Sequence, residues 1–152
     1  MIEHVRCIGI LAATAVLGVM PHASEPPRLE VAGDRHGVIW SAPIVRGELF
    51  AVEYVHSAER SVWVHQYRAG AKAGVEQLTS TFQAFGAGMP VTPPHVAAEM
   101  SPRGFTVAAP RTFSAIPFMN WRRSALTLQY RGRFIPVGRW LDEYEPFTVR
   151  IR

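Results

Sequence analysis

Short runs of alternating apolar and polar residues, punctuated by glycine and proline, make up most of the chain after residue 23. The 152 residues include 12 glycines and 12 prolines, and no segment after residue 23 keeps a helical period. Alternation sends successive side chains to opposite faces of a strand, while glycine and proline mark turns. The pattern predicts an all-β fold, either an antiparallel β-sandwich or a small barrel. The predicted strands are 28–32, 38–40, 48–57, 62–68, 74–84, 105–109, 113–118, 125–130, 134–137 and 147–151.

The strands predicted over 48–57 and 62–68 are close enough in the chain to form an antiparallel hairpin. A turn through residues 58–61 would place His56 opposite Val62 and Glu53 opposite His65. This register puts one apolar face toward the core and leaves the polar residues on the other face with Trp63 and Tyr67. The predicted core face consists of Phe50, Val52, Tyr54, Val62 and Val64.

The N-terminus has the pattern of an export signal. Arg6 precedes an apolar run over residues 7–20, which ends at Pro21-His22-Ala23. About 14 apolar residues are short for a membrane-spanning helix but suit the core of a signal peptide. We expect a helical signal peptide or membrane anchor over 1–23, a linker over 24–27 and a single β domain over 28–152. A buried N-terminal helix is the alternative. The export pattern predicts a periplasmic protein, or one anchored to the outer face of the inner membrane.

Cysteine content and charge limit the chemistry of the domain. Cys7 is the only cysteine, so an exported chain cleaved after residue 23 has no thiol for disulfides, zinc or nucleophilic catalysis. The net charge is +4, and seven arginines lie between Ser101 and Leu141 without an intervening acid. Such a segment favours anionic small molecules, acidic lipid head groups or an acidic protein face as partners, and solvated arginines spread over several faces are the alternative. No recognition motif for nucleic acid is present. The seven residues are Arg103, Arg111, Arg122, Arg123, Arg131, Arg133 and Arg139.

Two short segments carry the candidate binding residues. His56 and Ser57 are neighbours on a strand and point to opposite faces, which excludes them as a nucleophile and its base. They either contact a ligand or fix the hairpin end, where Glu59 and Arg60 form the turn. The loop from Phe85 to Pro90 places two glycines one residue apart, so its N–H groups either hold an anion or form a tight turn. The candidate residues are His56, Ser57, Glu59, Arg60, Gly86, Gly88 and Met89.

Glu53 opposite His65 is the one acid–histidine pair that the spacing predicts, and it would orient a proton donor or form half of a metal site. No third ligand is visible, since His36 and His95 have no ligand spacing to either residue. We therefore assign no catalytic residue, no metal ligand and no cofactor. The four tryptophans are most simply core residues, with an aromatic ligand-binding stripe as the alternative.

Residues 54–61, Tyr-Val-His-Ser-Ala-Glu-Arg-Ser, and residues 85–90, Phe-Gly-Ala-Gly-Met-Pro, resemble the signature of a bacterial family called domain of unknown function 1850. The resemblance is clear from Phe50 to Pro90 and weaker to Arg152. Val62 and His65 depart from it, because family members often have proline and an acidic residue there. The family has no assigned activity. It implies a small exported or membrane-associated protein, often encoded beside or fused to the membrane component of TRAP transporters that use a TAXI-type binding protein.

We therefore expect an exported accessory domain that assists a TRAP-type uptake system by binding a transporter component or an anionic solute. A hydrolase or metal-dependent enzyme using His56, Glu53 and His65 is one alternative, and a structural envelope protein is the other. A cleft containing arginines, at which the His56 hairpin end and the glycine loop converge, would favour binding.

Overall fold

The computed structural model describes residues 25–70, 74–83, 98–102 and 104–152, which form two antiparallel β-sheets. This architecture confirms the predicted sandwich and excludes the closed barrel. The smaller sheet has the order β2 (Gly37–Pro43), β1 (Arg28–Gly33), β11 (Pro146–Ile151) and β8 (Ala115–Met119). The larger sheet has the order β10 (Arg133–Ile135), β9 (Thr127–Tyr130), β3 (Leu49–Val55), β4 (Val62–Ala69), β5 (Val75–Phe82), β7 (Gly104–Phe113) and β6 (Ala98–Ser101).

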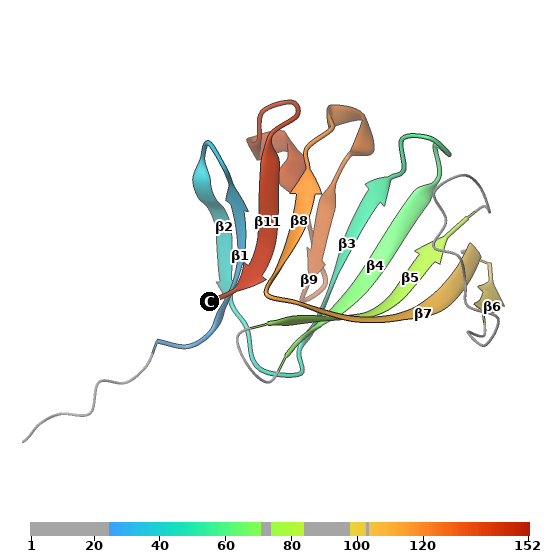
Figure 1. The fold of residues 1–152 in the computed structure, drawn as a ribbon, viewed down its shortest axis with the longest axis horizontal. Coiled ribbons are helices and arrows are strands. Elements are labelled where there is room, and N and C mark those ends of the chain that lie inside the picture. The colour runs from blue at the N-terminus through green and yellow to red at the C-terminus, as the bar shows by residue number, and fades with distance from the viewer. Residues whose placement is uncertain (1–24, 71–73, 84–97, 103) are drawn as a thin grey trace, which may run out of the picture.

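Two short 3₁₀ helices, η1 (Arg122–Ser124) and η2 (Val137–Trp140), connect strands at one end of the sandwich. Figure 1 shows η1, the β3–β4 turn and the β1–β2 turn together at the upper end. The first described residues and the C-terminus lie at the lower end. Among the described residues, no helix has the length and hydropathy needed to cross a membrane.

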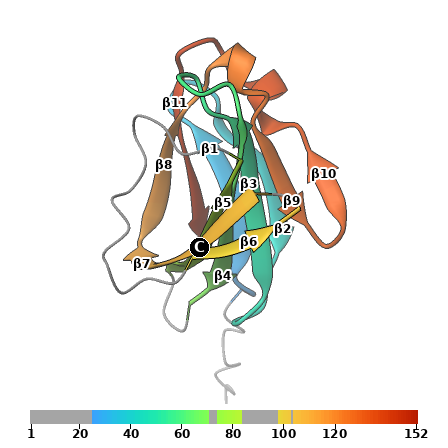
Figure 2. The same ribbon diagram turned by 90° about the vertical axis from the view of Figure 1, so that its right-hand side faces the viewer.

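The main core lies between the smaller sheet and the β9–β3 part of the larger one. Leu29, Val31 and Val149 from one sheet and Val52 and Leu128 from the other are fully buried in a single cluster. The side view places β8 and β9 on opposite sides of this core (Figure 2). Burying an aliphatic side chain of this size stabilises the fold by about 1.5–3 kcal/mol, so this cluster explains why the two sheets pack here.

The larger sheet extends beyond the smaller one, as Figure 1 shows for β4, β5 and β7. A second, smaller cluster lies on this extension and consists of Trp63, Phe82 and Val107, with Tyr54 and Phe105 packed against it. Because Tyr54 also packs against the main core, it lies at the boundary between the two clusters. The smaller sheet ends at β8, and β8 therefore borders the exposed part of the larger sheet.

The predicted register of the β3–β4 hairpin is wrong by one residue. Val55 pairs with Val62, Tyr54 with Trp63 and Val52 with His65. A shift of one residue turns every side chain of one strand to the other face. Trp63 and Tyr67 are consequently buried on the core side with Phe50, Val52 and Tyr54, while Val62 and Val64 lie on the opposite face and are only partly buried.

Most predicted strands are confirmed, with different limits in the C-terminal half. β7 continues to Phe113, and the chain then enters the other sheet as β8. Residues 98–101 form the edge strand β6, where no strand was predicted, and Val137, predicted to end a strand, begins η2 instead. The predicted N-terminal helix, signal peptide or anchor lies outside the described residues.

Gly104 makes the close contact that lets β7 begin beside β5. Its φ is +116°, and a Cβ at this position would overlap the backbone carbonyl of Phe82. We expect Gly104→Ala to lower the free energy of unfolding by more than about 2 kcal/mol, because backbone strain and a backbone clash combine. Gly132→Ala is the matched control, since Gly132 has a φ of +71° but open space around it. Chemical denaturation of both variants measures the difference, and equal losses would contradict the role of the clash.

Candidate functional site

The β3–β4 turn is closed by two backbone hydrogen bonds. The His56 N–H donates to the Ser61 carbonyl at 2.9 Å, and the Arg60 N–H donates to the His56 carbonyl at 2.8 Å. His56 therefore faces Ser61 instead of Val62, so the turn between the facing residues is one residue shorter than predicted, and this accounts for the shifted register. Arg60 has a φ of +53°, in the left-handed region that disfavours side chains with a Cβ. The side chain of Arg60 is exposed, although the backbone that carries it is strained.

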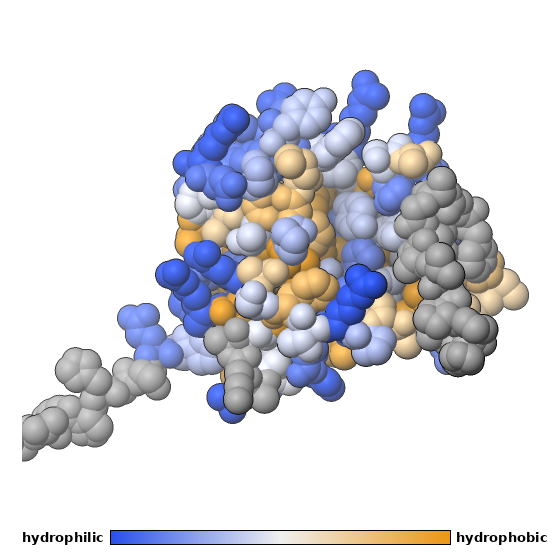
Figure 3. Space-filling view, viewed as in Figure 1, coloured by the Kyte–Doolittle hydropathy of each residue, from blue (hydrophilic) through white to orange (hydrophobic). Residues whose placement is uncertain are grey.

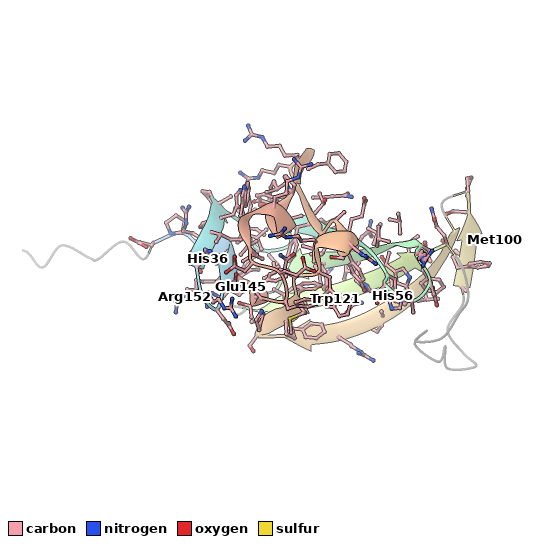
Figure 4. The ribbon with its side chains drawn as sticks, turned by 90° about the horizontal axis from the view of Figure 1, so that it is seen from above. His36, His56, Met100, Trp121, Glu145 and Arg152 are labelled. Carbon is pink, nitrogen blue, oxygen red and sulfur yellow. The ribbon has the colours of Figure 1, made fainter. Side chains whose placement is uncertain are left out.

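A cleft of about 870 Å³ lies between this turn, the end of β8 and η1. Its walls are largely apolar and combine residues of both sheets, including Val55, Phe118 and Met119. Figure 3 shows orange apolar residues bordered at the upper end by blue hydrophilic ones. Trp121 and His56, which both line the cleft, are labelled in the view from above (Figure 4). The described lining residues are Tyr54, Val55, His56, Ser57, Arg60, Pro117, Phe118, Met119, Trp121, Arg123, Ser124 and Leu126.

Arginine supplies all the permanent charge among the described residues of the cleft. Arg60 and Arg123 line it, and no aspartate or glutamate does. Neither guanidinium forms an ion pair with a described residue, whereas Arg122 pairs with Glu143 and Arg131 pairs with Glu48. A guanidinium offers several N–H donors and no acceptor. The cleft therefore combines apolar walls with groups that favour the oxygens of an anion.

Buried polar atoms without a partner gather at the same turn. Such atoms occur on five of the described residues, and four of these lie between residues 56 and 63: His56 Nδ1, both Glu59 carboxylate oxygens, Ser61 Oγ and Trp63 Nε1. The His56 and Trp63 rings stack with centroids 4.5 Å apart. Buried polar groups are usually hydrogen-bonded. This concentration at one turn distinguishes it from the rest of the described chain.

A hydrogen-bonded chain of side chains runs behind the cleft. His65 Nε2 lies 3.0 Å from the Tyr54 hydroxyl, and His65 Nδ1 lies 2.8 Å from Ser80 Oγ. Gln77 Nε2 donates to Ser80 Oγ at 2.9 Å. Burial lowers the pKa of His65 to about 4 and raises the pKa of Tyr54 to about 12. At neutral pH, His65 is therefore uncharged and Tyr54 keeps its proton.

The predicted Glu53–His65 pair is wrong, for the same reason as the register. Glu53 pairs with Val64 across the hairpin, and its carboxylate accepts a hydrogen bond of 2.6 Å from Gln129 Nε2. His65 is bonded instead to Tyr54 and Ser80. This removes the acid–histidine geometry on which the enzymatic alternative rests.

A second polar cluster was not predicted from the sequence. In it, side-chain nitrogen and oxygen atoms of His36, Asp142 and Glu145 lie within 4.8 Å of one another. The Glu145 carboxylate is fully buried, and Figure 4 shows it beside His36 and apart from His56, which lines the cleft. Its Oε1 accepts from the Arg35 and His36 N–H groups at 2.9 and 3.3 Å. Its Oε2 contacts the Asp142 N–H at 2.9 Å and His36 Nδ1 at 2.8 Å. Because both oxygens are engaged, this cluster acts as a structural link between two turns.

The structure brings three of the predicted binding residues into the cleft, namely His56, Ser57 and Arg60. Glu59 belongs to the same turn but is not a lining residue. Gly86, Gly88 and Met89 lie outside the described residues.

The wall formed by Phe118, Met119 and Trp121 was not predicted from the sequence, and Arg123 was not distinguished from the other arginines. Trp121 and Trp140 are 45% and 44% exposed, so their prediction as core residues is wrong. Trp121 lines the cleft. The cluster of arginines after Ser101 was the available signal for Arg123. It could not identify which arginine faces the hairpin, because η1 and the β3–β4 turn meet only in the folded chain.

Comparison with known proteins confirms the resemblance seen in the two motifs. The model of a family described as a domain of unknown function (DUF1850) matches residues 50–137, more than half of the chain. The protein therefore belongs to this family. The match includes every described residue that lines the cleft. No curated protein and no solved structure matches the chain.

Proposed function

We propose that this DUF1850 domain is a non-enzymatic binding domain that holds an organic anion in the cleft between the β3–β4 turn and β8. The observation that carries the proposal is the pairing of Arg60 and Arg123 with apolar walls and no described acidic lining residue. A carboxylate would accept charge-assisted hydrogen bonds from the guanidinium groups. The apolar part of the same molecule would lie against Phe118, Met119 and Leu126.

The dimensions of the cleft favour a small molecule. Its volume of about 870 Å³ lies within the range of roughly 300–1,000 Å³ that is typical of small-molecule sites. Ser57 is exposed and follows His56 at the strand end, so the cleft has no nucleophile–base pair from these two residues. Binding without chemical conversion is the simplest function for such a site.

The family resemblance extends the proposal to an exported accessory domain in TRAP-type solute uptake, with the bound anion as the transported solute. The start of β1 lies at the opposite end of the sandwich from the β3–β4 turn (Figure 1), and this turn forms one side of the cleft. If residues 1–23 remain as a membrane anchor, the linker over 24–27 joins that anchor to the end farthest from the cleft. The cleft would then face away from the membrane, toward a soluble solute or binding protein.

Calorimetric titration with octanoate tests the binding proposal, with octylamine as a probe of equal chain length and opposite charge. We expect the protein to bind octanoate and to bind octylamine much more weakly. Arg123→Gln should weaken octanoate binding by about tenfold or more, because one charge-assisted hydrogen bond is lost.

Arg133→Gln is the matched control, since Arg133 is exposed on β10 and does not line the cleft. Its octanoate affinity should stay within about twofold of the wild type. Equal losses in the two variants, or equal affinity for octanoate and octylamine, would contradict a site in this cleft.

A further inference from the structure

The side chains of Gln77, Ser80, His65 and Tyr54 form a continuous hydrogen-bonded chain that ends at the cleft. Tyr54 lines the cleft and contacts Phe118, another lining residue, with ring centroids 6.5 Å apart. Ser80 and Gln77 are buried, with 2% and 9% exposure. These hydrogen bonds therefore connect the buried side chains of β5, through His65 of β4, to Tyr54 at the wall of the cleft.

The direction of these hydrogen bonds follows from the donors and acceptors available. The Gln77 amide nitrogen can only donate, and it contacts both Ser80 Oγ at 2.9 Å and His65 Nδ1 at 3.4 Å. With His65 Nδ1 as the acceptor of the ring, both the Gln77 N–H and the Ser80 hydroxyl can donate to it, and we assign this tautomer. The hydrogen of the neutral His65 ring is consequently on Nε2, which donates to the Tyr54 hydroxyl oxygen at 3.0 Å.

This arrangement uses the Tyr54 oxygen as an acceptor and leaves its hydroxyl hydrogen free to donate. No described residue accepts that hydrogen. The opposite ring tautomer would place two donors on Ser80 Oγ and turn the Tyr54 hydroxyl toward His65. The chain behind the cleft thus decides whether Tyr54 presents a donor or an acceptor to a ligand.

We propose that the Tyr54 hydroxyl donates a hydrogen bond to the carboxylate of the bound ligand, and that Gln77, Ser80 and His65 position it by fixing the His65 tautomer. The inference rests on the proposed function and specifies its ligand class. With Tyr54, Arg60 and Arg123 all acting as donors, the site recognises a carboxylate whose oxygens only accept, attached to an apolar chain. Tyr54 is then the only uncharged donor of the three, and it recognises the position of the carboxylate oxygen rather than its charge.

Two measurements test this inference separately from the proposed function. The first is the His65 tautomer in the ligand-free protein, read from the ¹⁵N shifts of its ring nitrogens at neutral pH. We expect the hydrogen on Nε2. A ring with the hydrogen on Nδ1 would overturn the inference, whether or not octanoate binds. Ser80→Ala removes the hydroxyl that faces Nδ1, and we expect it to shift the tautomer toward Nδ1–H.

The second measurement is octanoate affinity. We expect Tyr54→Phe to weaken binding by roughly tenfold to a hundredfold, since a hydrogen bond to a charged group is lost. Ser80→Ala should weaken it less, in proportion to the change of tautomer. Both variants are compared by circular dichroism and thermal unfolding to verify the fold. If the wild type binds octanoate and Tyr54→Phe binds it equally well, the inference is wrong while the proposed function stands. If the wild type binds no octanoate, the proposed function fails and the ligand contact fails with it.

Discussion

Replacing Glu145 with glutamine is expected to lower the midpoint of thermal unfolding by roughly 10 °C or more. The carboxylate is fully buried and accepts from three backbone N–H groups and from the His36 ring. Glutamine keeps the size of the side chain but replaces one acceptor oxygen with an amide NH₂ group, whose hydrogens would face the hydrogens of other donors. The affected donors lie in two turns more than 100 residues apart, so both turns should loosen together.

Glu143→Gln is the matched control, because Glu143 lies two residues away and its ion pair with Arg122 at 3.3 Å is at the surface. Exposed ion pairs contribute little to stability, so we expect a shift in the unfolding midpoint of only a few degrees. Calorimetry on both variants makes the comparison. Equal shifts would show that the buried hydrogen bonds of Glu145 have no special role.

The same carboxylate predicts a dependence of stability on pH. Burial alone would raise the pKa of Glu145, but the hydrogen bonds from Asp142, Arg35 and His36 outweigh it and lower the pKa from 4.5 to about 2. The folded protein therefore binds fewer protons than the unfolded chain between these values, and the stabilisation is lost as the pH falls from about 4.5 to about 2. Glu48 titrates in the same window, since its hydrogen bond from Arg131 lowers its pKa to about 2.

The contribution of Glu145 is consequently measured as the difference in the free energy of unfolding between the wild type and Glu145→Gln. We expect their stabilities to converge as the pH is lowered through this window. A constant difference between pH 6 and pH 2 would contradict the pKa assigned to Glu145.

The sequence predicted the strands well wherever one face of a strand is buried. β3, β4 and β5 alternate clearly, and their predicted limits differ from the structure by at most two residues. Alternation could not fix the register between β3 and β4, because the turn has no Gly or Asn at the left-handed position. That position is Arg60, and its residue type gives no local signal for a left-handed turn.

The candidate site was predictable only in the part that is local in sequence. His56, Ser57 and Arg60 belong to one turn. The position of this turn is evident from the clear alternation of the strands on either side of it. The opposite wall comes from β8 and η1, about 60 residues later, after the chain has moved from the larger to the smaller sheet at Phe113. The hydrogen bonds between His36 and Glu145 span 109 residues. Neither contact has a periodicity or a spacing that a single sequence can reveal.

Arg60 is a residue whose replacement should affect ligand binding and stability in opposite directions. Its φ of +53° costs a side chain with a Cβ about 1 kcal/mol relative to glycine. We expect Arg60→Gly to raise the free energy of unfolding by about this amount and, at the same time, to weaken octanoate binding by about tenfold or more. If Arg60 served only the stability of the turn, Arg60→Gly would change the free energy of unfolding and the octanoate affinity in the same direction.

Two further variants separate the backbone effect from the charge effect. Arg60→Gln keeps the strained backbone and removes the charge, so we expect weak octanoate binding without a gain in stability. Ala125→Gly relaxes another left-handed position, with a φ of +47°, and leaves both arginines in place. It should stabilise the fold and keep the octanoate affinity. Full affinity in Arg60→Gly would remove this arginine from the site, whereas a stabilised variant that no longer binds would show that the turn is strained because Arg60 holds the ligand.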